Sequence, residues 1–301
     1  MDALSRVEPS RQAVWWRAFR PKTLSLALAP VLMGTAWVLA TGSPFRVEVL
    51  LLAALAAVAI QVGTNLWNDA LDAEHGVDDG ARLGPRRATA AGWLSGRSVR
   101  RAALGSFALA AALGAVLVAI GGWPILLLGT AAIALGLAYS AGPLPLSATP
   151  LGEALVLAFF GVFAVVGTVW LHAATAPSEV WLLGLFTGLP AAAVLLVNNH
   201  RDRLSDSRSG RKTLAIRLGV GHTRRLYAGL LGLAALAPLA LRPDCAAAWL
   251  GTGALVLTAS WLASAFAATP VDRRLNRFLM QTGRFQLLYV AVMALVLWLC
   301  G

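Results

Sequence analysis

The residues best suited to chemistry lie in segment 61–89, where an apolar run ends in amides, carboxylates and then arginines. If a helix continues through the first part of this segment, Asn65, Asp69 and Asp72 lie at i, i+4 and i+7, on one face. Asn68 lies beside them. Several oxygen ligands on one helical face suit a hard cation such as Mg²⁺, which binds carboxylates, water and substrate phosphates. We therefore predict that this face binds Mg²⁺.

Three arginines follow these acidic residues. A Gly-Pro pair lies between Arg82 and Arg86, and Arg87 comes next. Guanidinium groups bind phosphate oxygens in a fixed, often bidentate geometry. The whole segment is therefore suited to a phosphate compound that carries a metal ion.

A second segment, 198–212, repeats this pattern. Its polar residues are amides, two carboxylates, a glycine and a basic pair: Asn198, Asn199, Asp202, Asp206, Gly210, Arg211 and Lys212. The first amide and the two carboxylates lie at i, i+4 and i+8, again on one helical face. Either segment alone is explained equally well as a solvated loop after a helix. Two matching copies at corresponding helix ends favour a function.

The composition indicates the elements that position these residues. Of the 301 residues, 58% are hydrophobic and 13% are charged, which excludes a soluble domain and predicts an all-α, multi-pass transmembrane bundle. We expect one domain over residues 1–301, with about nine spans. The apolar segments are 23–41, 47–66, 102–121, 123–141, 153–174, 180–199, 225–241, 245–267 and 282–300.

The basic residues predict the orientation of the bundle. Of the 25 Lys and Arg residues, all except Arg46 and Arg242 fall in segments that the nine spans place on one side of the membrane: 1–22, 67–101, 201–225 and 268–284. By the positive-inside rule this side is cytoplasmic, so we expect both acidic clusters to face a cavity that opens to the cytoplasm from the inner (plasma) membrane. The net charge of +11 lies in short segments between spans, which indicates topology signals and an anionic substrate or lipid rather than nucleic acid. Residues 1–22 are predicted to form an amphipathic cytoplasmic segment.

The cysteines and histidines form no metal-binding pattern. Cys245 and Cys300 fall near the outer ends of their segments, where a disulfide is possible, although two isolated cysteines usually have no such role. His75 and His200 lie near the acidic clusters, where a loop position is as plausible as a catalytic one.

The motifs resemble the UbiA superfamily of intramembrane prenyltransferases and, within it, the MenA branch, which prenylates 1,4-dihydroxy-2-naphthoate. The blocks that carry the resemblance keep the superfamily's order: 20–24 (RPKTL), 68–72 (NDALD), 76–86, 139–143 (YSAGP), 151–153 (LGE), 159–161 (FFG), 198–206 (NNHRDRLSD), 210–214 (GRKTL) and 217–219 (RLG). Beyond Gly219 only the hydrophobic pattern is similar.

The chain departs from the superfamily pattern in two places. Gly76 stands where the superfamily has a third Asp in its first motif, so Asp78 would replace that carboxylate as a metal ligand. Val194 and Asn198 replace a Tyr and a Lys upstream of the second motif, a change that itself resembles the MenA branch.

The resemblance implies transfer of a polyprenyl group from its diphosphate to 1,4-dihydroxy-2-naphthoate, with release of diphosphate and CO₂, to give demethylmenaquinone in menaquinone synthesis. It implies Mg²⁺ as the cofactor, held by Asp69, Asp72, Asp202 and Asp206, with Asp78 as the further candidate. The expected substrate-binding residues are Asn65, Asn68, Arg82, Arg86, Tyr139, Asn198, Asn199, Arg211 and Lys212.

The ring substrate and the allylic cation need further groups. Lys22 is the first candidate to bind the carboxylate of the ring, with Arg20 behind it, although both also fit as topology charges. Aromatic faces stabilise cations, and Trp67, Tyr139, Phe159 and Phe160 are the candidates. Glu153 is a candidate base or ligand.

Two other functions stay open. A related enzyme with a different aromatic acceptor would need the same diphosphate chemistry. An ion-coupled transporter would use paired acids within the membrane, but here the acids lie at the ends of spans. Divalent-metal-dependent release of diphosphate distinguishes an enzyme from a transporter.

Overall fold

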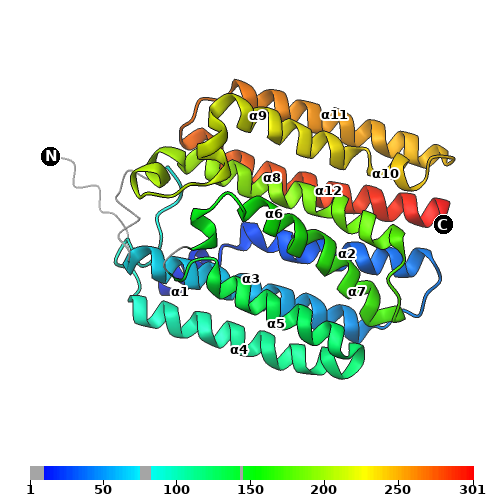
Figure 1. The fold of residues 1–301 in the computed structure, drawn as a ribbon, viewed down its shortest axis with the longest axis horizontal. Coiled ribbons are helices and arrows are strands. Elements are labelled where there is room, and N and C mark those ends of the chain that lie inside the picture. Colours follow the sequence, from blue (N-terminus) through cyan, green and yellow to red (C-terminus); the bar gives the residue numbers. More distant parts are fainter. Residues whose placement is uncertain (1–9, 75–82, 143–144) are drawn as a thin grey trace.

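A computed structural model describes residues 10–74, 83–142 and 145–301, and this part of the chain is helical, without strands (Figure 1). The α-helices are α1 (Arg11–Phe19), α2 (Leu24–Ala40), α3 (Val47–Glu74), α4 (Gly96–Gly121), α5 (Trp123–Ala138), α6 (Gly152–Leu157), α7 (Phe163–Ala173), α8 (Ser178–Arg208), α9 (Leu214–Ala235), α10 (Ala237–Leu241), α11 (Ala246–Ala268) and α12 (Asn276–Cys300). Short helical turns are η1 (Pro21–Thr23), η2 (Leu146–Ala148), η3 (Ala158–Val162) and η4 (Arg273–Leu275), of which η3 is a π-helical turn between α6 and α7.

Each of the nine predicted apolar segments coincides with helix in the structure. Within the described residues, seven helical stretches are long and apolar enough to cross a membrane: Arg11–Ala40, Val47–Glu74, Gly96–Gly121, Gly152–Ala173, Ser178–Arg208, Ala246–Ala268 and Arg273–Cys300. The other two predicted segments form the 16-residue α5 and the helices α9 and α10, which meet at Leu236. The protein is therefore an integral membrane protein with an all-helical core.

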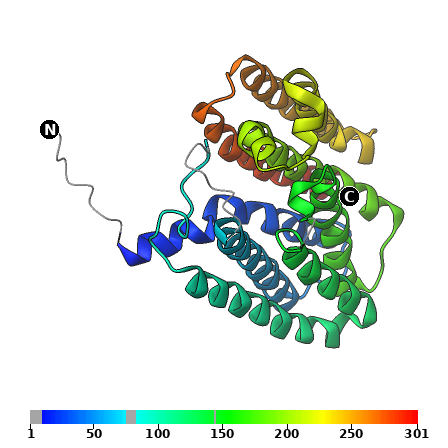
Figure 2. The same ribbon diagram turned by 60° about the vertical axis from the view of Figure 1, so that its left-hand side comes forward.

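The long helices lie roughly side by side along the longest axis of the molecule (Figure 1). Helices α9 and α11 lie along one side, α4 lies along the opposite side, and α8, α12 and α2 lie between them (Figures 1 and 2). The main hydrophobic core joins α2, α7, α8, α9, α11 and α12, and Met33, Leu196, Leu231 and Met293 are fully buried in it. This core packs α2 and α7 against the helices of the C-terminal part of the chain.

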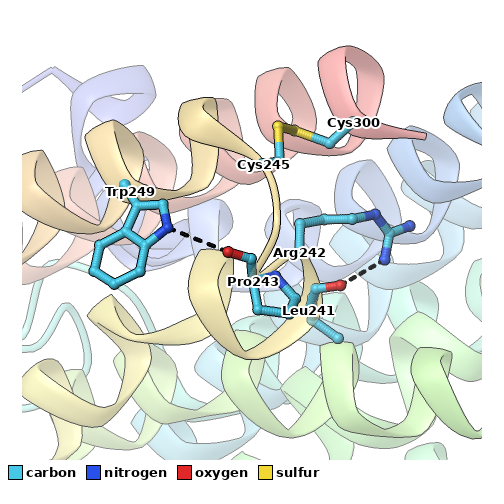
Figure 3. The surroundings of a disulfide bond; sticks show 6 residues. All are labelled: Leu241, Arg242, Pro243, Cys245, Trp249 and Cys300. Carbon is cyan, nitrogen blue, oxygen red and sulfur yellow. Dashed lines mark hydrogen bonds between the residues drawn. A yellow bond between two sulfur atoms is a disulfide. The ribbon is translucent and has the colours of Figure 1, made fainter.

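The ends of α3 and α8 that carry the two acidic segments lie at the same end of the molecule (Figure 1). The opposite end carries the disulfide between Cys245 and Cys300, which ties the start of α11 to the end of α12 (Figure 3). The disulfide that the sequence showed only to be possible is therefore present. Beside it, Trp249 Nε1 donates a hydrogen bond to the Pro243 carbonyl at 3.2 Å, which closes the turn before α11.

Candidate functional site

A cavity of about 1150 Å³ begins among the polar ends of α3 and α8 and continues into the apolar interior. Its polar part is lined by residues of both acidic segments, including Asp69, Asp202 and Asp206. Its apolar part lies between α2, α3, α4, α5 and α7 and reaches Ile125 and Leu171, near the end of the molecule that carries the disulfide. The cavity thus combines a charged head with a long apolar body.

Asp72 of the first segment is buried between two arginines. Arg211 Nη2 donates to Asp72 Oδ1 at 2.8 Å, and Arg87 forms an ion pair with Asp72 Oδ2. Arg87 Nη1 also donates to the Asn68 carbonyl at 2.8 Å, so this guanidinium binds the backbone of α3 as well as its carboxylate. A buried carboxylate needs such partners, because removal of the charge from water is costly.

Asp69 holds the loop that follows α3. Its carboxylate accepts hydrogen bonds from the Ala88 N–H at 3.2 Å, the Thr89 N–H at 3.4 Å and the Thr89 hydroxyl. The Thr89 hydroxyl is also 2.9 Å from the Asp69 carbonyl. Asp69 therefore fixes the loop that carries Arg86 and Arg87 against the end of α3.

The amides of α3 bind neighbouring segments. Asn65 Nδ2 donates to the Phe19 carbonyl and to Thr23 Oγ1, both at 3.1 Å, and so holds the junction between α1 and α2. Asn68 Nδ2 donates to Ser140 Oγ at 2.7 Å, beyond the end of α5. Both asparagines also line the cavity.

The second segment is organised by Arg201, whose side chain is 1% exposed. Arg201 Nε and Nη2 donate to the two carboxylate oxygens of Asp202 at 2.8 and 2.5 Å, a bidentate pair. Nη2 also donates to Asn198 Oδ1 at 2.8 Å, and Nη1 donates to Asn276 Oδ1 at 2.7 Å. This arginine thereby links α8 to the start of α12.

The end of α8 directs Arg211 toward both segments. Gly210 has φ +78°, which is the left-handed position that glycine favours after a helix. The Gly210 N–H donates to the Ser207 carbonyl and the Arg211 N–H donates to the Asp206 carbonyl, the two bonds of a Schellman motif. The Arg211 side chain then lies 3.5 Å from Asp206 Oδ1 as well as 2.8 Å from Asp72 Oδ1. One guanidinium thus joins the two acidic segments.

The donor atoms at this site are suitable for a hard cation, since they are carboxylate and amide oxygens. Within the described residues, no group of three or more His, Cys, Asp and Glu side chains is arranged to hold a metal ion. Arg87, Arg201 and Arg211 instead form ion pairs with Asp72, Asp202 and Asp206. A divalent ion that arrives with a diphosphate would therefore share these carboxylates with arginines that can bind the phosphate oxygens.

The other predicted basic residues have different places. Lys22 and Arg86 are exposed and line the cavity, whereas Lys212 is exposed and lies outside its lining. Arg20 also lines the cavity and has φ +53°, a left-handed conformation that is uncommon for a residue other than glycine. Asp78 and Arg82 lie outside the described residues.

Aromatic residues line the cavity below the charged part. Tyr139, Phe159 and Phe160 all do so, whereas Trp67 donates its indole N–H to the Leu137 carbonyl at 3.1 Å and is not part of the lining. Adjacent side chains on a regular α-helix point about 100° apart. Phe159 and Phe160 are adjacent and both line the cavity, but they lie in the π-turn η3 rather than in a regular helix. This turn packs tightly against α8, because a Cβ on Gly161 would lie 2.4 Å from Gly188 Cα.

Two further candidates lie away from the cavity lining. Glu153 is buried and accepts a hydrogen bond from Asn199 Nδ2 at 2.9 Å, so it orients an amide that does line the cavity. His200 is fully buried, with its ring centroid 5.3 Å from that of Phe266 of α11. His200 is therefore a core residue.

Polar side chains in these contacts that were not among the predicted site residues include Thr89, Ser140, Arg201 and Asn276. Arg87, which was grouped with the phosphate-binding arginines, instead lies against Asp72 and the Asn68 carbonyl. Arg87 was visible in the sequence as one of three arginines, but spacing favoured none of the three. Ser140 lies within the YSAGP block. Asn276 follows the region of resemblance and carries no motif.

The fold and this site define a class of protein: a membrane-embedded helical bundle whose cavity joins a charged end to a long apolar body. The chain belongs to the UbiA prenyltransferase family, whose model matches residues 27–287.

Similar proteins include curated relatives and solved structures. The chain is 37% identical to the 1,4-dihydroxy-2-naphthoate octaprenyltransferase of Escherichia coli over 74% of each chain. It is 36% identical to the protein of the same name from Mycobacterium tuberculosis, over 87% of this chain and 84% of that one. Among solved structures, a UbiA homolog from Archaeoglobus fulgidus bound to GPP and Mg²⁺ has a TM-score of 0.68 at 16% identity, covering 94% of this chain and 99% of that one.

Proposed function

We propose that this protein transfers a polyprenyl group from polyprenyl diphosphate to 1,4-dihydroxy-2-naphthoate, with release of diphosphate and CO₂, in menaquinone synthesis. The observation that carries the proposal is the cavity, in which residues of both acidic segments adjoin a long apolar space. A prenyl diphosphate has the same two parts. The choice of acceptor is supported by the relatives from Escherichia coli and Mycobacterium tuberculosis, which carry that substrate in their names.

The reaction needs a site that stabilises a leaving diphosphate. When the C–O bond of the prenyl diphosphate breaks, its electron pair leaves with the diphosphate and an allylic cation remains. A ring carbon then forms the new C–C bond, and the carboxylate of the ring leaves as CO₂ while its bonding pair stays on the ring. The product is the quinol of demethylmenaquinone, which becomes the quinone on oxidation.

The charged end of the cavity has the groups for the first step. Asp69, Asp202 and Asp206 line the cavity, and Asp72 lies outside the lining against Arg87 and Arg211; these four are the residues that would hold Mg²⁺, which when bound would neutralise charge on the leaving diphosphate. Arg86 and Arg211 would bind the remaining phosphate oxygens, since both line the cavity. Asp78 and Arg82 are further candidates from the sequence. This arrangement assigns Arg211 to carboxylates in the free protein and to phosphate in the complex.

The apolar part of the cavity suits the later steps. Tyr139, Phe159 and Phe160 line the cavity, and their aromatic rings would stabilise an allylic cation there. The apolar walls exclude water, which would otherwise capture the cation. Lys22 would bind the carboxylate of the acceptor from the cavity mouth, with Asn198 and Asn199 as neutral donors nearby.

We also propose that the site opens to the cytoplasm from the inner membrane. All Lys and Arg residues except Arg46 and Arg242 lie in segments on the site's side of the predicted topology. The disulfide lies at the opposite end of the molecule, and disulfides persist in oxidising compartments. Two independent features thus support one orientation.

The test is incubation of the purified protein with 1,4-dihydroxy-2-naphthoate, polyprenyl diphosphates of several lengths and Mg²⁺, with products identified by mass. We expect a prenylated, decarboxylated product and an equal amount of diphosphate. Product formation only with 4-hydroxybenzoate or another ring would show that this ring, and not dihydroxynaphthoate, is the acceptor. Absence of metal-dependent diphosphate release with any acceptor would reject the enzyme and favour a transporter.

A further inference from the structure

Asn276 connects three segments that meet at the charged end of the cavity. Its Oδ1 accepts from Arg201 Nη1 of α8 at 2.7 Å, and its Nδ2 donates to the Leu83 carbonyl at 3.0 Å. Arg201 in turn binds Asp202, and Leu83 begins the described part of the loop that carries Arg86. The donor and the acceptor of one amide are thus directed to different segments.

The position of Asn276 is fixed by its neighbours. Leu275 and Phe278 on either side are fully buried in the main core, and Asn276 begins α12 between them. Its side chain lines the cavity. An amide on a packed helix end is a rigid support, whereas the loop that it contacts has an irregular backbone.

The loop is held on both sides of Arg86. Directly after it, Arg87 binds the Asn68 carbonyl and the Asp72 carboxylate of α3. At the far end of the loop, Asp69 accepts hydrogen bonds from Ala88 and Thr89. At Leu83, Asn276 provides the contact. Between these points lies Arg86, which is exposed and lines the cavity, where the proposed function places diphosphate.

We infer that Asn276 is a positioning residue for prenyl diphosphate, which acts by holding residues 83–86 over the charged end of the cavity. This inference rests on the proposed function. Without Asn276, the loop loses this attachment to α12 before Arg86, while its attachment to α3 after Arg86, through Arg87 and Asp69, remains. Loss of this attachment should weaken the binding of prenyl diphosphate, and the weakening should depend on the presence of Arg86.

The first experiment measures the loop directly and does not need activity. Trypsin cleavage after Arg86 is followed by mass in detergent for the unaltered protein, Asn276→Ala, Asn276→Gln and the control Arg284→Gln, an exposed residue of α12. We expect cleavage after Arg86 to be faster by roughly 3- to 10-fold in both Asn276 variants, the change expected from one lost hydrogen bond. The control should be cleaved as the unaltered protein is. Should Asn276→Ala not fold, Asn276→Gln carries the test, since it keeps the amide and displaces it by one methylene.

The second experiment is a double-mutant cycle with Arg86→Gln. Affinity for geranyl thiolodiphosphate with Mg²⁺ is measured by thermal shift, in variants with and without each change. We expect Asn276→Ala to weaken binding by roughly 3- to 10-fold when Arg86 is present and by less than about 2-fold when it is absent. Equal effects in both backgrounds, or an unchanged cleavage rate, would overturn the inference. If the unaltered protein does not bind the thiolodiphosphate, the proposed function fails instead, and the cleavage experiment still decides whether Asn276 holds the loop.

Discussion

The guanidinium of Arg211 lies 2.8 Å from the carboxylate of Asp72, a residue 139 positions earlier in the chain. The same guanidinium lies 3.5 Å from Asp206, so the acidic segments of α3 and α8 share one cation. The helices that carry them end at the same end of the molecule, and the Schellman motif at Gly210 turns the chain so that Arg211 reaches both. The two segments therefore form one electrostatic unit, because Asp72 and Asp206 share Arg211 and a change to either carboxylate affects the arginine that the other contacts.

Arg87 and Arg86 are adjacent but are expected to have separable roles. Arg87 is buried against Asp72 and the Asn68 carbonyl, whereas Arg86 is exposed at the cavity. Arg87→Gln should destabilise the protein by about 1.5–3 kcal/mol, the range for a lost hydrogen bond to a charged group. This loss is measured as a lower melting temperature in detergent.

Arg86→Gln is the matched control for that experiment. It should leave the melting temperature unchanged and raise the KM for prenyl diphosphate, because its guanidinium is available to a ligand. Equal melting temperatures for the two variants would contradict the assignment of Arg87 to the support of α3.

Lys22 is expected to bind the carboxylate of the acceptor. It is exposed and lines the cavity, in the turn η1 that follows α1, and lies on a different segment from Asp72 and Asp206. Lys22→Met should raise the KM for dihydroxynaphthoate by roughly 10- to 100-fold, because a charge-assisted contact contributes about 1.5–3 kcal/mol. The KM for prenyl diphosphate should stay nearly constant. A change in membrane insertion alone would show that Lys22 is a topology charge.

The orientation can be tested with a single cysteine. The chain has two cysteines, and both are in the disulfide between Cys245 and Cys300, so a cysteine at the exposed Ala90 would be the one reactive thiol. We expect this cysteine to react with a membrane-impermeant reagent in inside-out vesicles and not in intact cells. Labelling of intact cells would place the charged end of the cavity outside.

The helices could be predicted from the sequence because apolar runs of spanning length have few alternatives to helix. The two acidic segments were recognised because each combines a fixed spacing with the end of an apolar run. Which carboxylate meets which arginine was not predictable. Arg86 and Arg87 differ by one position, and the path of the loop decides that Arg87 is buried and Arg86 is not.

Other contacts depend on segments that are distant in sequence. Asp69 was predicted as a metal ligand from its spacing, but spacing contains no information on Thr89, whose hydroxyl reaches back to Asp69. Asn276 is a single amide at the start of a helix, and it acquires partners only when α8, α12 and residue 83 come together. His200 belongs to the same helix as Asp202, yet it contacts Phe266 and the core, because side chains two residues apart on an α-helix point about 200° apart.

The central claim is that the two acidic segments act as one site, and a double-mutant cycle of Asp72→Asn and Asp206→Asn tests it most directly. Metal-dependent diphosphate release is measured for both single variants, the double variant and the control Asp244→Asn, an exposed residue. We expect each single change to lower turnover by roughly 10²-fold, the scale for loss of one preorganised charge-stabilising group. The double variant should lose little more than either single variant, since groups that act as a unit are non-additive, and the control should be unaffected. Fully multiplicative losses would contradict the account and assign the two segments to separate tasks.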